Sequence, residues 1–173
     1  MKVSYWDEAK KELSIKDDNL RKIINKSGNE FLTTSKDPFI TLFNSILGQQ
    51  ISVSAATSIK KKITSKVKIT PKDINNIPNE ILKKCGLSRM KISYLKDLSS
   101  KIINKEISFK NLNKLDDNEV IKYLTNVKGI GNWTAEMFMI FHLGRQNILP
   151  LKDIGIINSL VNMYGEDKKN INF

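Results

Sequence analysis

Two short stretches of the chain hold residues whose types and spacing could do chemistry. Lys128-Gly-Ile-Gly131 lies between two helical patterns, and Leu149-Pro-Leu-Lys-Asp153 follows the second of them. Glycine tolerates the positive φ that a tight turn requires, so backbone N–H groups at the start of the next helix could meet an anion. The stretch could equally be an ordinary turn between helices. Asp153 stands where a last helix begins, where a carboxylate could cap that helix or stabilise positive charge in a reaction.

A helical face between these stretches carries bulky apolar side chains. Trp133 and Met137 lie one turn apart and share the face with two further apolar residues. Such a face is typical of a protein core, and it could also line a binding pocket. Gln50 ends a Gly-Gln-Gln corner between two other helical patterns, where its amide could cap a helix or project outward. At each of these positions both interpretations stay open.

The elements that must position these residues have the pattern of helices. Apolar side chains recur at helical spacing, as from Phe39 to Leu47, and no stretch shows the alternation of a strand. Residue types favoured at helix starts precede the patterns at Asp17, Asp37, Ser52, Thr70, Ser88, Asp116 and Asp153. The sequence therefore predicts an all-α fold with about eight to ten short helices.

Composition narrows the class of protein. The 173 residues suffice for one domain or two small lobes. A formal net charge of +11 indicates a polyanionic partner, nucleic acid first and an anionic membrane second, although an AT-rich coding sequence would also enrich lysine. One cysteine and one histidine argue against an iron–sulfur cluster or a zinc site. We expect a cytoplasmic protein, because no stretch has the length of a membrane span or the pattern of a signal peptide.

Four blocks of the sequence, in this order, resemble the helix-hairpin-helix (HhH-GPD) DNA glycosylases, specifically the DNA-3-methyladenine glycosylase II group. They are Ile46-Leu-Gly-Gln-Gln-Ile-Ser52, Gly86-Leu-Ser88, Lys128-Gly-Ile-Gly-Asn-Trp-Thr-Ala-Glu-Met137 and Leu149-Pro-Leu-Lys-Asp-Ile-Gly155. The resemblance runs from about Pro38 to about Tyr164. It implies a single two-lobed domain over residues 1–173, with a core lobe at about 38–123, the helix-hairpin-helix at about 120–145, and packing helices at about 1–37 and 146–173.

The resemblance also implies an activity. It is that of a monofunctional N-glycosylase, which flips alkylated purines such as 3-methyladenine and 7-methylguanine out of duplex DNA and excises them in base excision repair. The implied site residues are Asp153 for catalysis, Trp133 and Met137 for the base pocket, Gln50 for intercalation, and Lys128, Gly129, Ile130 and Gly131 for a DNA phosphate. A Na⁺ or K⁺ ion at the carbonyls of Val127 and Ile130 is the sole implied cofactor. The implied partner is damaged double-stranded DNA of the nucleoid, bound by a monomer, with no membrane involved.

Two departures from the family pattern affect these expectations. Trp133 stands where the bifunctional lyases of the family carry a Schiff-base lysine, so we expect no strand cleavage. Members of the family also continue past this last helix into a further segment that bears tryptophan and arginine. This chain ends at Phe173, so the resemblance implies either a fragment or a chain whose N-terminus compensates. The alternatives are a catalytically weak or inactive DNA-binding protein and a glycosylase or lyase for another damaged base.

Overall fold

The computed structural model describes residues 2–165, and this part of the chain is helical. Its helices are α1 (Trp6–Lys16), α2 (Asp18–Ser27), α3 (Pro38–Gly48), α4 (Val53–Thr64), α5 (Pro71–Asn76), α6 (Asn79–Lys84), α7 (Arg89–Ile103), α8 (Asp117–Leu124), α9 (Asn132–Phe138) and α10 (Ile154–Tyr164). A 3-10 turn, Leu112–Lys114, precedes α8, and a π-helical turn, Met139–Leu143, continues α9. Over residues 2–165 the only strand-like pairing is one bridge between Lys2 and Thr33. The predicted all-α fold is confirmed.

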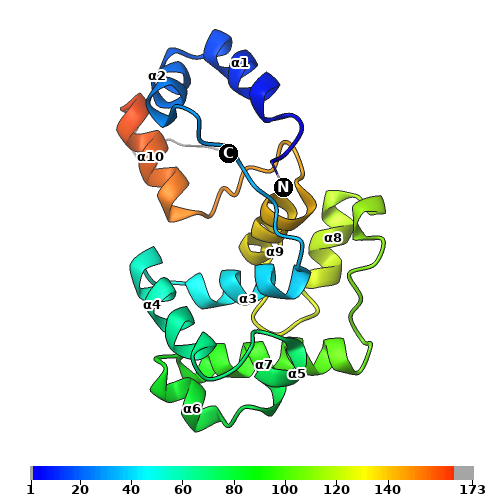
Figure 1. Cartoon of the computed structure of the whole chain (residues 1–173). Coiled ribbons are helices and arrows are strands. Elements are labelled where there is room, and N and C mark those ends of the chain that lie inside the picture. Colours follow the sequence, from blue (N-terminus) through cyan, green and yellow to red (C-terminus); the bar gives the residue numbers. More distant parts are fainter. Residues whose placement is uncertain (1, 166–173) are drawn as a thin grey trace.

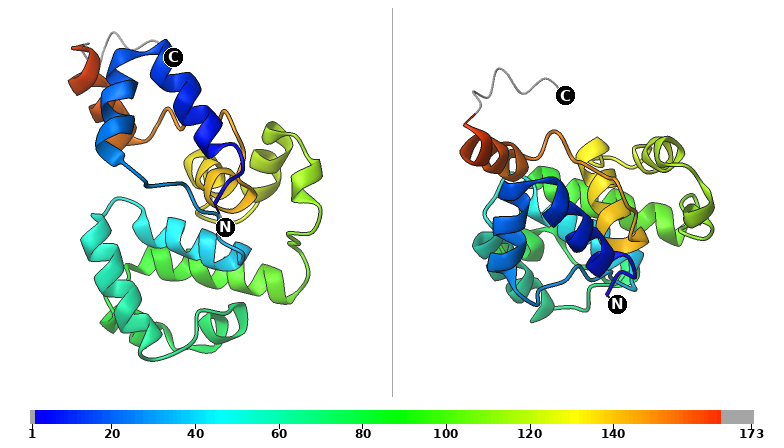
Figure 2. Two further views of the ribbon diagram at one scale, coloured as in Figure 1. Left: turned by 45° about the horizontal axis from the view of Figure 1, so that its top comes forward. Right: turned by 90° about the horizontal axis from the view of Figure 1, so that it is seen from above.

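The helices form two lobes (Figure 1). One lobe holds α3 to α7, with α8 and α9 beside it, and the other combines α1 and α2 with α10 from the far end of the described chain. The linker after α2 and the loop between α9 and α10 join the lobes, which lie apart in Figure 1 and in the left view of Figure 2; seen from above, the smaller lobe lies over the larger one. Residues 2–37 and 145–165 therefore meet in one lobe.

Helix α3 lies at the centre of the larger lobe because its apolar stripe is buried. Phe39, Leu42, Phe43, Ile46 and Leu47 are each at most 3% exposed. The helix packs against α4, α7 and α9, and α7 in turn packs against α5 and α6. The stripe predicted from the sequence is confirmed, and it places the end of α3 beside the start of α9.

The expected helix starts are also confirmed, because each side chain accepts a backbone N–H of its own helix. The capping residues are Asp17, Asp37, Ser52, Thr70, Ser88, Asp116 and Asp153. Helix α1 has no such signal in the sequence, since Tyr5 precedes it and makes no side-chain cap. Sequence analysis accordingly missed it.

The smaller lobe is thinly packed. None of its three helices contains a fully buried residue. Polar bonds tie α2 to α10: Asn19 donates to the carbonyl of Met163 over 3.2 Å, and the Tyr164 hydroxyl donates to Asp17 over 2.9 Å. The expectation about a segment after the last helix concerns positions beyond Gly165, outside the described residues. Within them, no helix combines the length and the apolar character needed to span a bilayer.

Candidate active site

A cleft of about 790 Å³ opens where the two lobes face each other. The corner between α3 and α4, the start of α9 and the start of α10 line it. A second hollow of about 630 Å³ continues along α3 and α4 and shares the side chains of Trp133 and Asp153 with the first. The fold thus brings together four predicted site residues that lie far apart in the chain: Gln50, Gly131, Trp133 and Asp153.

Asp153 caps a helix, and its position in the cleft is compatible with the second role that the sequence left open. Its Oδ1 caps α10, accepting the N–H groups of Gly155 at 2.8 Å and Ile156 at 3.2 Å. Its Oδ2 accepts the indole N–H of Trp133 at 2.8 Å. Three donors therefore hold the carboxylate in one orientation: Oδ1 accepts two of them, and Oδ2 accepts one and keeps a lone pair that none of these donors uses. A carboxylate fixed in this way can stabilise positive charge that develops inside the cleft.

Trp133 holds that carboxylate and lines the cleft as well. Its ring borders both parts of the cleft and is only partly buried, so the interpretation of Trp133 as plain core is wrong. Met137, one turn further along α9, is 9% exposed and borders neither part. Its place in a base pocket stays a prediction, and its burial favours packing.

The two hairpin glycines differ in why they are glycine. Gly129 has a φ of +81°, and a Cβ added there would lie 2.1 Å from the Tyr94 ring. Gly131 has an extended backbone, with φ at −100°, and a Cβ there would meet no atom within 4 Å. The expectation that both glycines serve a turn with positive φ is therefore wrong for Gly131. Its missing side chain instead leaves open space at the start of α9, where no side chain caps the helix.

Hydrogen bonds to α7 and within the loop fix the hairpin. The backbone N–H of Lys128 donates to Asp97 of α7 over 2.9 Å, and that of Ile130 donates to the carbonyl of Val127 over 3.1 Å. These two N–H groups are committed within the fold. An anion at this hairpin would therefore meet the first N–H groups of α9, which the helix leaves unpaired.

The corner after α3 holds Gln50 in a strained conformation. The N–H of Ile51 donates to the carbonyl of Gly48 over 3.4 Å, and Gln49 between them has φ −53° and ψ 126°. Gln50 follows with a φ of +56°. This is the geometry of a type II turn, which favours glycine at the position that Gln50 occupies. The strain, of order 1–2 kcal/mol, keeps an exposed amide at the edge of the cleft.

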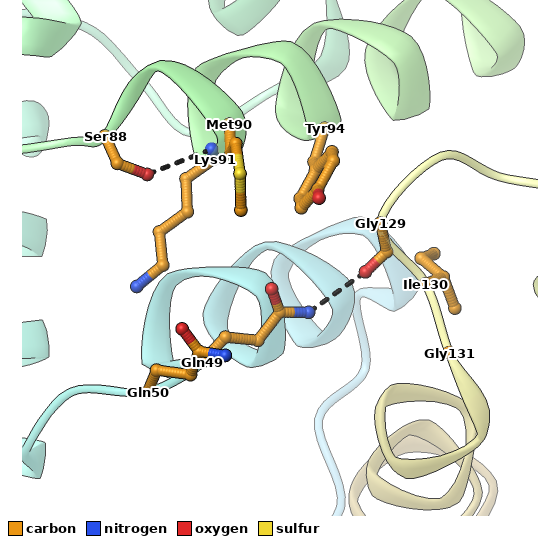
Figure 3. A pocket seen from close by; sticks show the side chains of 9 residues that line it. All are labelled: Gln49, Gln50, Ser88, Met90, Lys91, Tyr94, Gly129, Ile130 and Gly131. Carbon is orange, nitrogen blue, oxygen red and sulfur yellow. Dashed lines mark hydrogen bonds between the residues drawn. The ribbon is translucent and has the colours of Figure 1, made fainter.

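Gln49 is a site residue that sequence analysis missed. Its amide Nε2 donates to the carbonyl of Gly129 over 3.0 Å and to the Thr134 hydroxyl over 3.1 Å. Figure 3 shows the first of these bonds: the Gln49 side chain reaches the hairpin, and the Gln50 side chain takes no part in this bond. No local pattern distinguishes two adjacent glutamines, so the sequence offered no signal for this division.

A second carboxylate lies near the cleft. Burial raises the pKa of Glu136 on α9 above its usual range, and the positive charge of Lys152 opposes that shift. Lys152 itself lines the cleft beside Asp153. Glu136 was not singled out from the sequence, because a glutamate inside a helical pattern is ordinarily a surface residue.

Comparison with known proteins matches this geometry to a family. DNA-3-methyladenine glycosylase 1 of Schizosaccharomyces pombe is 34% identical over 164 residues, covering 90% of this chain and 72% of that protein. The S. pombe 3-methyladenine DNA glycosylase in complex with abasic DNA superposes with a TM-score of 0.84 at 30% identity, covering 95% of this chain and 85% of that one. The DNA-3-methyladenine glycosidase of Bacillus halodurans superposes with a TM-score of 0.71 at 32% identity, covering 91% and 75%. Residues 43–171 match the HhH-GPD superfamily of base excision DNA repair proteins, and the chain belongs to this family.

Proposed function

We propose that this protein is a monofunctional DNA glycosylase that excises alkylated purines, 3-methyladenine and 7-methylguanine among them, during base excision repair. The observation that carries the proposal is the Asp153 carboxylate, held by Trp133 in the cleft between the lobes. The relatives named for 3-methyladenine removal, which align with most of this chain, support the choice of substrate.

The chemistry follows from the position of the carboxylate. A base inside a duplex cannot be reached, so the nucleotide must first rotate into the cleft. When the N-glycosidic bond breaks, the base leaves with the bonding electrons and positive charge develops on the sugar. Asp153 stabilises that charge more strongly in the transition state than in the ground state, and water then adds at C1′. A cationic alkylated base is already a good leaving group, and the face of Trp133 favours cationic bases.

Hydrolysis rather than elimination fits the residue at position 133. A lyase needs an amine there to form a Schiff base with the sugar, whereas this chain has an indole whose N–H is committed to Asp153. The product would be an intact strand with an abasic site. Lys152 also lines the cleft, so strand nicking is the measurement that checks this part of the proposal.

The hairpin and the corner supply the contacts to DNA. Gly131 and the start of α9 bind a phosphate, with the exposed Lys128 beside them, and Gln50 fills the gap that the flipped nucleotide leaves. The net charge of +11 supports duplex DNA as the partner. We place the protein as a monomer on DNA of the nucleoid in the cytoplasm.

A monovalent cation fits the hairpin. The Val127 carbonyl accepts a single hydrogen bond, from Ile130, and a carbonyl oxygen has two lone pairs. The carbonyls of Val127 and Ile130 would hold Na⁺ or K⁺, which would add positive charge close to the bound phosphate.

Incubation with methylated duplex DNA tests the proposal. We expect release of free 3-methyladenine and 7-methylguanine, measured by chromatography, with no strand nicking until the abasic product is cleaved by hot alkali. Unmethylated duplex is the control for substrate. DNA binding without base release would instead identify a catalytically silent DNA-binding protein, and nicking without alkali would identify a lyase.

Replacing Gln50 by glycine should separate stability from activity. Glycine relieves the positive φ at this position, so the free energy of unfolding should stay unchanged or rise by up to about 1 kcal/mol. Base release should fall by about tenfold or more, because no side chain would fill the gap in the duplex. Urea unfolding and single-turnover base release measure the two effects. A Gln50→Gly variant with wild-type base release would remove Gln50 from the site.

A further inference from the structure

Gln49 joins the two structures proposed to contact DNA. The residue directly follows α3 as its C-cap, and its amide crosses to the hairpin, where one nitrogen donates to both the Gly129 carbonyl and the Thr134 hydroxyl. Thr134 is 2% exposed, so its end of this contact is buried, and both residues lie at the wall of the cleft. The partners are eighty or more positions away in the chain.

The strained corner needs such support. A positive φ at a residue other than glycine persists only where the surroundings hold it. Lys91 of α7 holds one side of the corner, because its Nζ donates to the carbonyl of Leu47 at the end of α3 over 2.7 Å. Gln49 holds the other side. In Figure 3 the Gln49 amide points towards Gly129, and the Lys91 amine lies on the opposite side of the corner.

The same amide also reaches the catalytic pair. Thr134 directly follows Trp133, and Trp133 donates to the Asp153 carboxylate over 2.8 Å. One continuous path of hydrogen bonds and adjacent residues therefore runs from Gln50 through Gln49 to Thr134, and on to Trp133 and Asp153. A shift at the corner would displace the start of α9, and with it the indole that orients the carboxylate.

We propose that Gln49 is a positioning residue for base excision, which sets the Gln50 corner, the phosphate-binding hairpin and the Trp133–Asp153 pair in one geometry. The inference rests on the proposed function. Gln49 exerts this role through its bonds to Gly129 and Thr134. Its contribution depends on the ability of its side chain to donate a hydrogen bond to the Gly129 carbonyl.

Substitution by glutamate tests the donated bond itself. In Gln49→Glu the side chain keeps its size, but an ionised carboxylate can only accept, so it would repel the Gly129 carbonyl. A protonated carboxyl can donate again. At pH 8 we expect single-turnover base release, measured with saturating enzyme on methylated duplex, to be slower than in the wild type by about tenfold or more. The deficit should shrink as the pH falls below about 5, because a glutamate carboxyl, whose ordinary pKa is about 4.3, becomes protonated there.

Gln49→Leu is the matched control. Leucine is close in size and donates at no pH, so its deficit should persist across the whole range. Urea unfolding of both variants separates positioning from loss of the fold, since the rates are compared only at pH values where each protein is folded. DNA without enzyme, incubated at each pH, corrects for spontaneous loss of the methylated base.

The outcomes are distinct. Recovery of the glutamate variant at low pH, without recovery of the leucine variant, supports the positioning role. Equal rates for wild type and both variants would overturn it, as would a glutamate variant that is folded and slow at every pH. If the wild type releases no base, the proposed function fails and the positioning role fails with it. An active wild type with unaffected variants refutes the positioning role alone.

Discussion

Asp153→Asn should slow base release by at least about 100-fold while the protein stays folded and still binds DNA. Asparagine caps a helix about as well as aspartate, so the bonds to Gly155 and Ile156 can remain. The negative charge next to the sugar is lost, and the Trp133 N–H no longer faces an anion. We expect the free energy of unfolding to change by less than about 1 kcal/mol.

Single-turnover base release on methylated duplex and urea unfolding measure the two quantities. Asp116→Asn is the matched control, because Asp116 caps α8 through the Glu119 N–H, outside the residues that line the cleft. This control should leave base release unchanged. If Asp153→Asn releases base within a few-fold of the wild-type rate, the carboxylate is a helix cap and the catalytic assignment is wrong.

Valine should destabilise the fold much more at Gly129 than at Gly131, although only one residue separates the two positions. At Gly129 the new Cβ would overlap the Tyr94 ring and the backbone would keep a positive φ, so we expect a loss of about 2–4 kcal/mol in the free energy of unfolding. At Gly131 the Cβ meets nothing, and the loss should be at most about 1 kcal/mol.

DNA binding separates the variants further. Gly131→Val should bind all duplexes more weakly and to the same degree, because its side chain would occupy the space in which a phosphate approaches the start of α9. Fluorescence anisotropy with several undamaged duplexes of unrelated sequence measures this. A loss confined to some sequences, or no loss at all, would contradict the role of the hairpin in phosphate binding.

Trp133 affects the proposed reaction in two ways. Its identity removes the amine that elimination would require, and its N–H orients the carboxylate that hydrolysis requires. Since the indole also borders the cleft, a change at this position would alter base contact and carboxylate orientation together. Trp133 and Asp153, whose roles the sequence left open separately, are thus joined by a single hydrogen bond.

The sequence by itself determined the helices and the residues that begin them. Capping depends on a side chain and an N–H two or three positions later, and the buried stripe of α3 depends on helical spacing, so both are local and can be read from the order of residues. The four blocks likewise predicted Asp153 and the hairpin as site residues from short stretches of sequence. The start of helix α1 was not predicted, because the helix begins without a capping side chain.

Only the tertiary structure decided how these parts work together. The bond between Trp133 and Asp153, the reach of Gln49 to Gly129, and the contact of Gly129 with Tyr94 each join segments that are distant in the chain. Such contacts leave no periodic pattern in either segment, because each depends on the packing of whole helices. Two adjacent glutamines and two neighbouring glycines therefore looked equivalent in the sequence, and the fold gave each of them a different task.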